Sequence, residues 1–240
     1  MDNFISSTQN KLIKQVKKIL KGDKTYFVIE GKNIIVEAIN NNVEIKYIFE
    51  LNNSNIFKNS IKITENVLKA ITSTKSPEGY VALCEKNLNN TIGTNIVFCD
   101  NVQDPGNIGT IIRSAVAFGY DTIFTNVNVY NPKIIRSSQG ALFKINIIEY
   151  DDPIIQIKNL ALDNKIYITT LDKDSKIYNK VLYPGLNKVI VFGNEGHGVN
   201  KKIYSFASEK IHIPIKFESL NVAVAAGIIL NNTYNGDKNE

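Results

Sequence analysis

The sequence has few of the residues on which metal centres and disulfide-stabilised folds depend. Its 240 residues include two cysteines, two histidines and no tryptophan. Cys84 and Cys99 both lie in apolar, strand-like runs, which favours buried free thiols in a reducing compartment over a disulfide or a ligand pair. Histidine and cysteine do not occur at metal-ligand spacing, so we expect a protein that needs no metal.

Long apolar runs are missing as well. The sequence contains no stretch of about 18 apolar residues, which a membrane-spanning helix requires, and residues 1–20 lack the pattern of a signal peptide. We therefore expect a cytoplasmic protein without a membrane partner.

Arginine is almost absent. Lysine occupies 26 of the 28 basic positions, and the two arginines are Arg113 and Arg136. The chain also has 37 isoleucines and 32 asparagines, which is typical of an A+T-rich genome. In a chain that otherwise uses lysine, an arginine indicates a need for a planar group with several donors. This favours a function for Arg113 over simple solvation, whereas both interpretations stay open for Arg136.

The charge that is present is unevenly distributed. Residues 1–90 hold 13 lysines and nine acidic residues, a net charge of +4 out of +5 for the whole chain. This balance suits a nucleic-acid partner without proving one. Lysines 11, 14, 18 and 21 form a stripe on a predicted helix at 6–21, for which a solvated face and contacts to RNA phosphates are equally good interpretations.

Apolar and amphipathic segments alternate in two series, which predicts two α/β domains. The first series has predicted strands at 26–30, 45–51, 61–63 and 80–84, and predicted helices at 6–21, 32–40 and 65–71. Ser6 or Ser7 is the expected cap of the first helix. We place the first domain at residues 1–88, a linker at 89–94 and the second domain at 95–240.

The second domain alternates regularly. Predicted strands are 96–99, 122–125, 145–148, 166–169, 189–192 and 211–213; predicted helices are 108–118, 132–138, 153–162, a short one near 201–206, and 221–231. Six strands separated by helices predict a mostly parallel sheet with helices on both faces. Open sheets of this class bind ligands at the carboxyl ends of their strands.

Two short segments near the end of the chain indicate where a ligand binds. GNEGHG at residues 193–198 follows an apolar strand, and its glycines let the backbone adopt positive φ and approach a ligand closely. ESLNV at 218–222 has the pattern of a helix start, with Ser219 as the candidate cap. The glycines alone are equally consistent with a simple tight turn.

Three ordered segments resemble the motifs of the SpoU (TrmH-like) family. They are DPGNIGTIIRSAVAFG at 104–119, GNEGHG at 193–198, and IP with ESLNVAVAAGI at 213–228, and the resemblance covers about residues 95–232. Members of this family are RNA ribose 2′-O-methyltransferases that use S-adenosyl-L-methionine (AdoMet). The resemblance implies their SPOUT fold with a C-terminal trefoil knot, AdoMet as cofactor, RNA as partner and a homodimer.

A weaker resemblance concerns the first domain. FVIEGKNIIVEAI at 27–39 and SPEGYVAL at 76–83 resemble the RNA-binding amino-terminal domain of some family members, most of which modify large-subunit (23S) ribosomal RNA. Three alternatives stay open: a tRNA ribose 2′-O-methyltransferase, a SPOUT-like protein that binds RNA without catalysis, and a generic nucleotide-binding α/β protein. This sequence has no G-x-G-x-x-G after its predicted strands, which argues against a dinucleotide as the ligand of such a protein.

The resemblance also implies site residues. The implied catalytic residues are Arg113, Asn107, Glu195, Ser219 and Asn221. The implied cofactor-binding residues are Thr170, Leu171, Gly193, Asn194, Gly196, Ile213 and Leu220. The segment between Pro214 and Ser219 is shorter than in many members, so a tighter loop is expected at residues 217–220, beside the cofactor.

The chemistry of these groups limits the roles they can take. We interpret Arg113 as a cation that holds a phosphate and stabilises a forming alkoxide, since a guanidinium keeps its proton and cannot act as a base. Glu195 would accept a proton through water or orient Arg113 by a charge pair. His197 is expected to be structural or peripheral. The resemblance further implies a dimer contact built from the first and last helices of the second domain. Their apolar residues are expected to supply it: Ile108, Ile111, Ile112, Ala115, Val222, Ala226 and Ile229.

Overall fold

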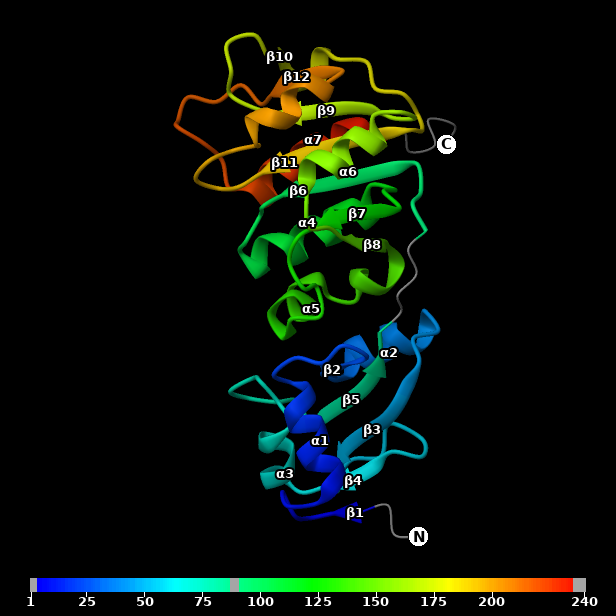
Figure 1. Ribbon diagram of the computed structural model, residues 1–240. Coiled ribbons are helices and arrows are strands. Elements are labelled where there is room, and N and C mark those ends of the chain that lie inside the picture. Colours follow the sequence, from blue (N-terminus) through cyan, green and yellow to red (C-terminus); the bar gives the residue numbers. More distant parts are fainter. Residues whose placement is uncertain (1–3, 87–90, 235–240) are drawn as a thin grey trace, which may run out of the picture. The chain divides into compact units, whose positions relative to one another are not determined.

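The computed structural model describes residues 4–86 and 91–234, and they fall into two compact units (Figure 1). The first unit combines residues of 1–88 with 130–143, and the second combines residues of 89–129 with 144–240. Each unit has its own sheet and its own apolar core. Of the linker expected at 89–94, residues 89 and 90 lie outside the described residues.

The first unit is a five-stranded mixed sheet with the order β1-β4-β3-β5-β2. Its strands are β1 (Phe4–Ile5), β2 (Tyr26–Glu30), β3 (Ile45–Leu51), β4 (Ile61–Ile63) and β5 (Tyr80–Glu85), and its helices are α1 (Lys11–Ile19), α2 (Lys32–Asn40), α3 (Glu65–Ala70) and α5 (Pro132–Ser138). Strand β3 pairs parallel with β4 and antiparallel with β5. The apolar runs therefore become strands nearly where the sequence predicts them.

Helix α1 begins later than predicted, because neither Ser6 nor Ser7 caps it. Asn10 is the cap, and its side chain accepts a hydrogen bond of 2.9 Å from the Leu12 amide. The buried side of the helix consists of Ile13, Val16 and Ile19. Lysines 11, 14, 18 and 21 are all exposed, so they are free to meet a ligand outside the protein.

Arg136, whose role the sequence leaves open, lies on α5 in the first unit. Its Nη1 donates a hydrogen bond of 2.6 Å to Ser73 Oγ. Ser73 Oγ in turn donates to the Glu30 carboxylate over 2.7 Å, and Thr74 Oγ1 donates to the same carboxylate over 2.9 Å. Arg136 therefore helps to hold the polar loop at 72–79.

The second unit is a seven-stranded sheet with the order β10-β12-β9-β11-β6-β7-β8. Its strands are β6 (Asn95–Asp100), β7 (Thr122–Thr125), β8 (Asn146–Glu149), β9 (Lys165–Thr169), β10 (Lys176–Ile177), β11 (Lys188–Gly193) and β12 (Glu209–His212). Every pairing among these described strands is parallel. The predicted mostly parallel sheet is confirmed, and the two-residue strand β10 is added at one edge.

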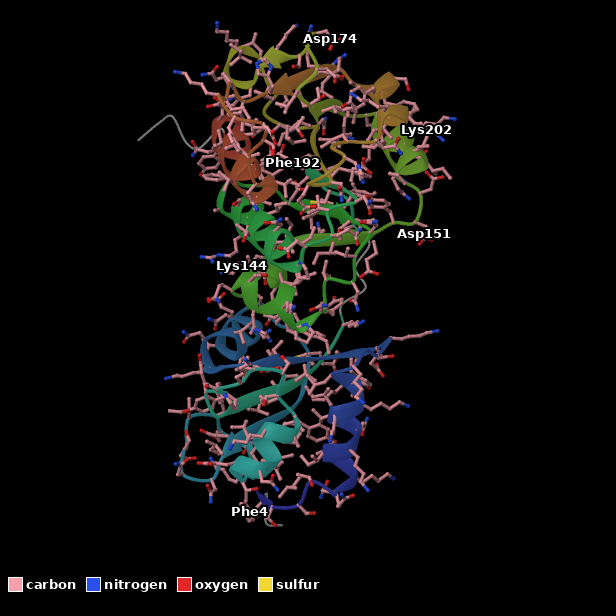
Figure 2. The ribbon with its side chains drawn as sticks, turned by 90° about the vertical axis from the view of Figure 1, so that its left-hand side faces the viewer. Phe4, Lys144, Asp151, Asp174, Phe192 and Lys202 are labelled. Carbon is pink, nitrogen blue, oxygen red and sulfur yellow. The ribbon has the colours of Figure 1, made fainter. Side chains whose placement is uncertain are left out.

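Helices cover both faces of this sheet (Figures 1 and 2). Helices α4 (Pro105–Ala117) and α7 (Val222–Thr233) pack together on one face, and α6 (Pro153–Leu160) packs with the 3₁₀-helix η3 (Lys201–Phe206) on the other. The core on the α6 side is built from residues such as Phe98, Ile168 and Val191. Figure 2 shows Phe192 inside this unit, at the end of β11.

The caps of α4 and α7 bring the motif residues to the edge of the sheet. Asp104 caps α4, so that helix begins at Pro105 rather than at Ile108. Asn221, not Ser219, caps α7, and its side-chain oxygen accepts hydrogen bonds from the Ala223 and Val224 amides. The expected cap at Ser219 is therefore wrong by two positions.

Cys84 and Cys99 are free and buried, which confirms the interpretation of the two thiols. Burial raises the pKa of the Cys84 thiol to about 12 and raises that of Cys99 as well. Within residues 4–86 and 91–234, no helix has both the length and the apolar composition for a membrane span.

Candidate active site

A cavity of about 430 Å³ lies at the carboxyl ends of β9, β11 and β12. All seven residues that the resemblance assigns to the cofactor line it. They are Thr170, Leu171, Gly193, Asn194, Gly196, Ile213 and Leu220. Three segments far apart in the sequence thus meet at one edge of the sheet, where a parallel sheet binds its ligands.

The glycine loop after β11 is shaped by close backbone contact rather than by positive φ at each glycine. A Cβ atom at Gly193 would lie 2.2 Å from the carbonyl carbon of Gly198 and from the Val199 nitrogen. The Asn194 and Gly198 backbones exchange two hydrogen bonds, of 3.1 and 2.9 Å. Of the three glycines in this loop, Gly198 alone has positive φ, at 68°, so the general expectation of positive φ is wrong for the other two.

Both polar atoms of the Asn194 side chain form hydrogen bonds that hold this loop. Its Oδ1 accepts hydrogen bonds from the Gly196 and His197 amides, at 2.9 and 3.1 Å. Its Nδ2 donates to the Asn101 carbonyl over 3.0 Å. Asn194 therefore joins the loop to the segment after β6, and its contribution to the cavity is to fix the shape of the wall.

A chain of side-chain hydrogen bonds joins the three motifs. The Asn221 Oδ1 atom accepts from backbone amides, so its Nδ2 is the donor that points to Asn107 Oδ1, over 2.9 Å. The Asn107 Nδ2 then donates to Glu195 Oε1 over 2.8 Å. Since each amide has its orientation set by the previous bond, the chain fixes the position of the Glu195 carboxylate in the cavity wall.

Arg113 and Ser219 lie apart from this hydrogen-bond chain. Arg113 is exposed on α4, and among the described residues no side chain or carbonyl accepts a hydrogen bond from its guanidinium. Its separation from Asn107 along the helix turns it to another face. The expected Glu195–Arg113 charge pair is absent from the described residues, because Arg113 lies on another face of α4. Glu195 accepts a hydrogen bond from Asn107 instead. Ser219 lines the cavity as an exposed residue.

The sequence analysis predicted Thr170 and Leu171 in the loop after β9, but it missed the part of the cavity rim that comes from η3. Tyr204 on η3 donates its hydroxyl hydrogen to Thr170 Oγ1 over 3.0 Å. Lys201 pairs with Asp172 at 2.8 Å, and this pair lowers the pKa of the Asp172 carboxyl. Tyr204, Lys201 and Asp172 belong to none of the three motifs, so the folded arrangement was needed to place them here. His197 also lines the cavity.

The residues of this cavity fit a nucleoside-sized cofactor. Its volume lies within the range of about 300–1,000 Å³ common for small-molecule sites. Phe192, Ile211 and Val222 supply apolar walls, and the strand ends supply backbone donors and acceptors. Within the described residues, no group of three or more His, Cys, Asp or Glu side chains could hold a metal ion.

Comparison with known proteins gives one family. The profile of the SpoU rRNA Methylase family matches residues 94–231. The chain is 31% identical over 244 residues to the 23S rRNA (guanosine(2553)-2′-O)-methyltransferase RlmP of Bacillus subtilis, and the match covers 94% of this chain and 97% of that protein.

Solved structures share the fold. An rRNA methyltransferase from Sinorhizobium meliloti has a TM-score of 0.83 at 24% identity, with 96% of each chain covered. The AdoMet-bound form of an rRNA methyltransferase from the same organism has a TM-score of 0.81 at 23% identity, again over 96% of each chain. At this level of identity the likeness is one of fold.

Proposed function

The chain belongs to the SpoU rRNA Methylase family, and we propose that it methylates a ribose 2′-hydroxyl in large-subunit (23S) ribosomal RNA. It is an RNA 2′-O-ribose methyltransferase that uses AdoMet. The match to RlmP supports 23S ribosomal RNA as the substrate, because it extends over nearly the whole of both chains and so includes the first unit. We place its action in the cytoplasm, where bacterial ribosomal RNA is found.

The cavity at the ends of β9, β11 and β12 is the proposed AdoMet site. Backbone groups near Thr170, Gly193 and Ile213 would hold the adenosine portion between the apolar walls. Bound there, AdoMet supplies an electrophilic methyl group for an in-line displacement. The closeness of Gly193 to the loop backbone means that this wall has little freedom to move, which favours a preformed site.

Glu195 is the proposed proton acceptor. The ribose hydroxyl loses its proton as its oxygen forms the new bond to carbon, and a carboxylate within hydrogen-bond reach, or one water away, can take that proton. Asn107 donates to one carboxylate oxygen, Oε1, and so leaves Oε2 for the hydroxyl or the water. In this proposal Asn221 acts through Asn107 and is a positioning residue, and Ser219 contributes to the loop that faces the nucleotide.

Arg113 is the proposed phosphate clamp. Its guanidinium is exposed and has no hydrogen-bond partner among the described residues, so its donors are available to RNA. A cation that reaches the phosphate next to the reacting ribose would hold that phosphate and lower the energy of negative charge on the oxygen.

We further propose a homodimer with a trefoil knot, as the resemblance implies, but with other residues of α4 and α7 at the interface. The seven apolar residues expected at the interface are buried inside the chain itself, each with 9% or less of its surface exposed. They already pack within the subunit and cannot also contact a partner. Val224, which is 51% exposed on α7, Ala117 and Ile228 remain available, so Val224→Glu should yield a monomer in sedimentation, while the parent protein sediments as a dimer.

The first unit is the proposed RNA-binding part. The exposed lysines of α1 and the loop at 72–79, held by Glu30 and Arg136, are its candidate contacts. Replacing Lys14, Lys18 and Lys21 together by glutamine should weaken RNA binding and flatten its salt dependence, since fewer counterions are released. AdoMet affinity should not change. Unaltered RNA affinity at matched salt would contradict this role.

The test of the proposed function is methyl transfer from labelled AdoMet to separate RNA preparations. The purified protein should label 23S ribosomal RNA lacking the modification and leave the small-subunit RNA and tRNA unlabelled, with the label on a 2′-oxygen. Labelling of tRNA alone would mean that the substrate is tRNA and not 23S ribosomal RNA. AdoMet binding without methyl transfer to any RNA would favour an RNA-binding protein without catalysis.

A further inference from the structure

The second unit has another cavity beside the proposed AdoMet site, and the mechanism proposed above assigns no role to it. Its volume is about 480 Å³. It lies at the carboxyl ends of β6, β7 and β8, with Asp100, Asn126 and Tyr150 in its lining. Asn194, His197 and Lys201 line both cavities, so the glycine loop that carries Glu195 separates the two.

Asp100 is a buried carboxylate whose hydrogen bonding is incomplete. Its surface is 3% exposed. One oxygen, Oδ2, accepts a hydrogen bond of 2.6 Å from the Asn200 amide, whereas Oδ1 has no hydrogen-bond partner among the described residues. Asn95 Oδ1 is the only fully enclosed side-chain polar atom without a partner in the described part of the chain. Asp100 Oδ1 is therefore not sealed off, and the space open to it is the cavity that Asp100 lines.

Two asparagines at the mouth of the cavity offer further hydrogen-bonding groups. Asn126 Nδ2 donates to Asn101 Oδ1 over 3.1 Å. This bond leaves the Asn126 carbonyl as an acceptor and the Asn101 amide as a donor, both without another partner among the described residues. Tyr150 adds an aromatic ring, stacked on Phe98 with centroids 4.8 Å apart. The lining thus combines acceptors, one donor and apolar surface.

The charge around the cavity argues against an anionic ligand. Asp100 and Asp151 both line it, and the one lysine in its lining, Lys201, already pairs with Asp172. A phosphate would meet two carboxylates and no unpaired lysine. A planar ring with N–H donors along one edge would instead satisfy Asp100 Oδ1, and aspartate is a known acceptor for such base edges.

We propose that this second cavity receives the base of the nucleotide whose ribose is methylated, and that Asp100 accepts a hydrogen bond from the N–H edge of that base. This inference rests on the proposed function. Base and ribose of one nucleotide are directly bonded, and the two cavities flank the loop that carries Glu195. Placing the base in one cavity would hold the ribose hydroxyl next to the other. A base drawn out of its stack into a fitted pocket is a known way for enzymes to reach a nucleotide in structured RNA.

The test uses a short RNA that contains the mapped nucleotide, and a matched RNA with an abasic ribose at that position. With the wild-type protein, single-turnover methylation below saturation should be roughly tenfold or more slower on the abasic RNA. Asp100→Asn should slow methylation of the parent RNA by a similar factor and cause no further loss on the abasic RNA. AdoMet affinity should be unchanged, and it reports that the variant is folded.

Asparagine keeps an oxygen for the Asn200 amide, so Asp100→Asn is expected to fold. Asn126→Ala, at an exposed position, is the second variant and should show the same pattern more weakly. Equal methylation rates of the wild-type protein on parent and abasic RNA would overturn the inference. So would a variant that methylates the abasic RNA more slowly than the wild-type protein does. A wild-type protein that methylates no RNA would instead overturn the proposed function.

Discussion

The side-chain amide of Asn107 lies 2.8 Å from the Glu195 carboxylate and donates a hydrogen bond to it across 88 positions of sequence. Asn221 extends the contact by donating to Asn107 Oδ1. One residue from each of the three motifs therefore belongs to a single hydrogen-bond chain. Its consequence is that the orientation of Glu195 depends on Asn107, which offers a direct way to test the mechanism.

Asn107→Ala should reduce the rate of methyl transfer by roughly 10²-fold, the usual effect of removing one well-placed electrostatic group. AdoMet affinity should change little, because Asn107 is not in the lining of the AdoMet cavity. Single-turnover methylation and equilibrium AdoMet binding, measured side by side, check both parts. Thr110→Ala, at an exposed position on the same helix, is the matched control. If Asn107→Ala methylates RNA as fast as Thr110→Ala, Asn107 has no role in methyl transfer.

Arg113→Lys keeps the positive charge but loses the planar fork. If the guanidinium holds a phosphate with two donors, transfer should slow by roughly 10²-fold or more while AdoMet still binds. Lys158→Arg, at an exposed position on α6, controls for a surface change of the same kind. Full activity of Arg113→Lys would mean that any cation suffices, and a collapse of AdoMet binding would mean that α4 shapes the cofactor pocket.

Gly193→Ala and Gly196→Ala form a steric pair within one loop. A Cβ at Gly193 meets backbone atoms at 2.2 Å, whereas the nearest atom to a Cβ at Gly196 is Asn194 Oδ1 at 3.6 Å. We expect Gly193→Ala to lower the melting temperature and to abolish AdoMet binding, since the loop has to open to admit the methyl group. Gly196→Ala should melt close to the parent protein. Calorimetry measures the melting temperature of each variant, and equal values for the two would contradict the contact distances given above.

Glu50 should make the stability of the first unit depend on pH. Its carboxylate is fully buried. Burial alone would raise its pKa, but hydrogen bonds from the Ile56 amide, Lys62, Ser60 and Ser54 outweigh this and lower the pKa from 4.5 to about 2. Because the pKa is lowered in the folded state, the stabilisation is complete above pH 4.5 and is lost as pH falls towards 2.

Glu50→Gln should accordingly cost roughly 3 kcal/mol near neutral pH, because Lys62 then loses its buried partner. The gap in melting temperature between wild type and variant should narrow as pH falls from 4.5 towards 2. Glu65→Gln, at an exposed position on α3, is the control and should melt like the parent. A gap that stays constant across this range would show that Glu50 acts through packing alone.

Much of the fold follows from local patterns. The runs that became β2, β3, β4 and β7 were predicted to the residue, because each is short and rich in apolar residues and its ends are marked by polar turns. Strands β1 and β10 have two residues each, too few for any periodicity. The cap of α1 was missed because Ser6, Ser7 and Asn10 are all good caps, and the local pattern does not select one of them.

The site was partly predictable for a related reason. Motif residues with unusual local requirements, such as Gly193, stand out in the sequence. The hydrogen-bond partners do not, since Asn107 and Glu195 are brought together by the order of strands in the sheet. The second cavity left no local signal, because its lining comes from the ends of β6, β7, β8 and β11. The apolar residues of α4 and α7 were assigned to a dimer contact, although both helices bury them against the sheet and each other.

The most direct test is a map of 2′-O-methylation across total RNA from cells with and without the gene. The account predicts that a single 2′-O-methyl group disappears from 23S ribosomal RNA when the gene is lost, and that it returns with the wild-type gene but not with Asn107→Ala. An unchanged map, or a loss confined to tRNA, would contradict the proposed function.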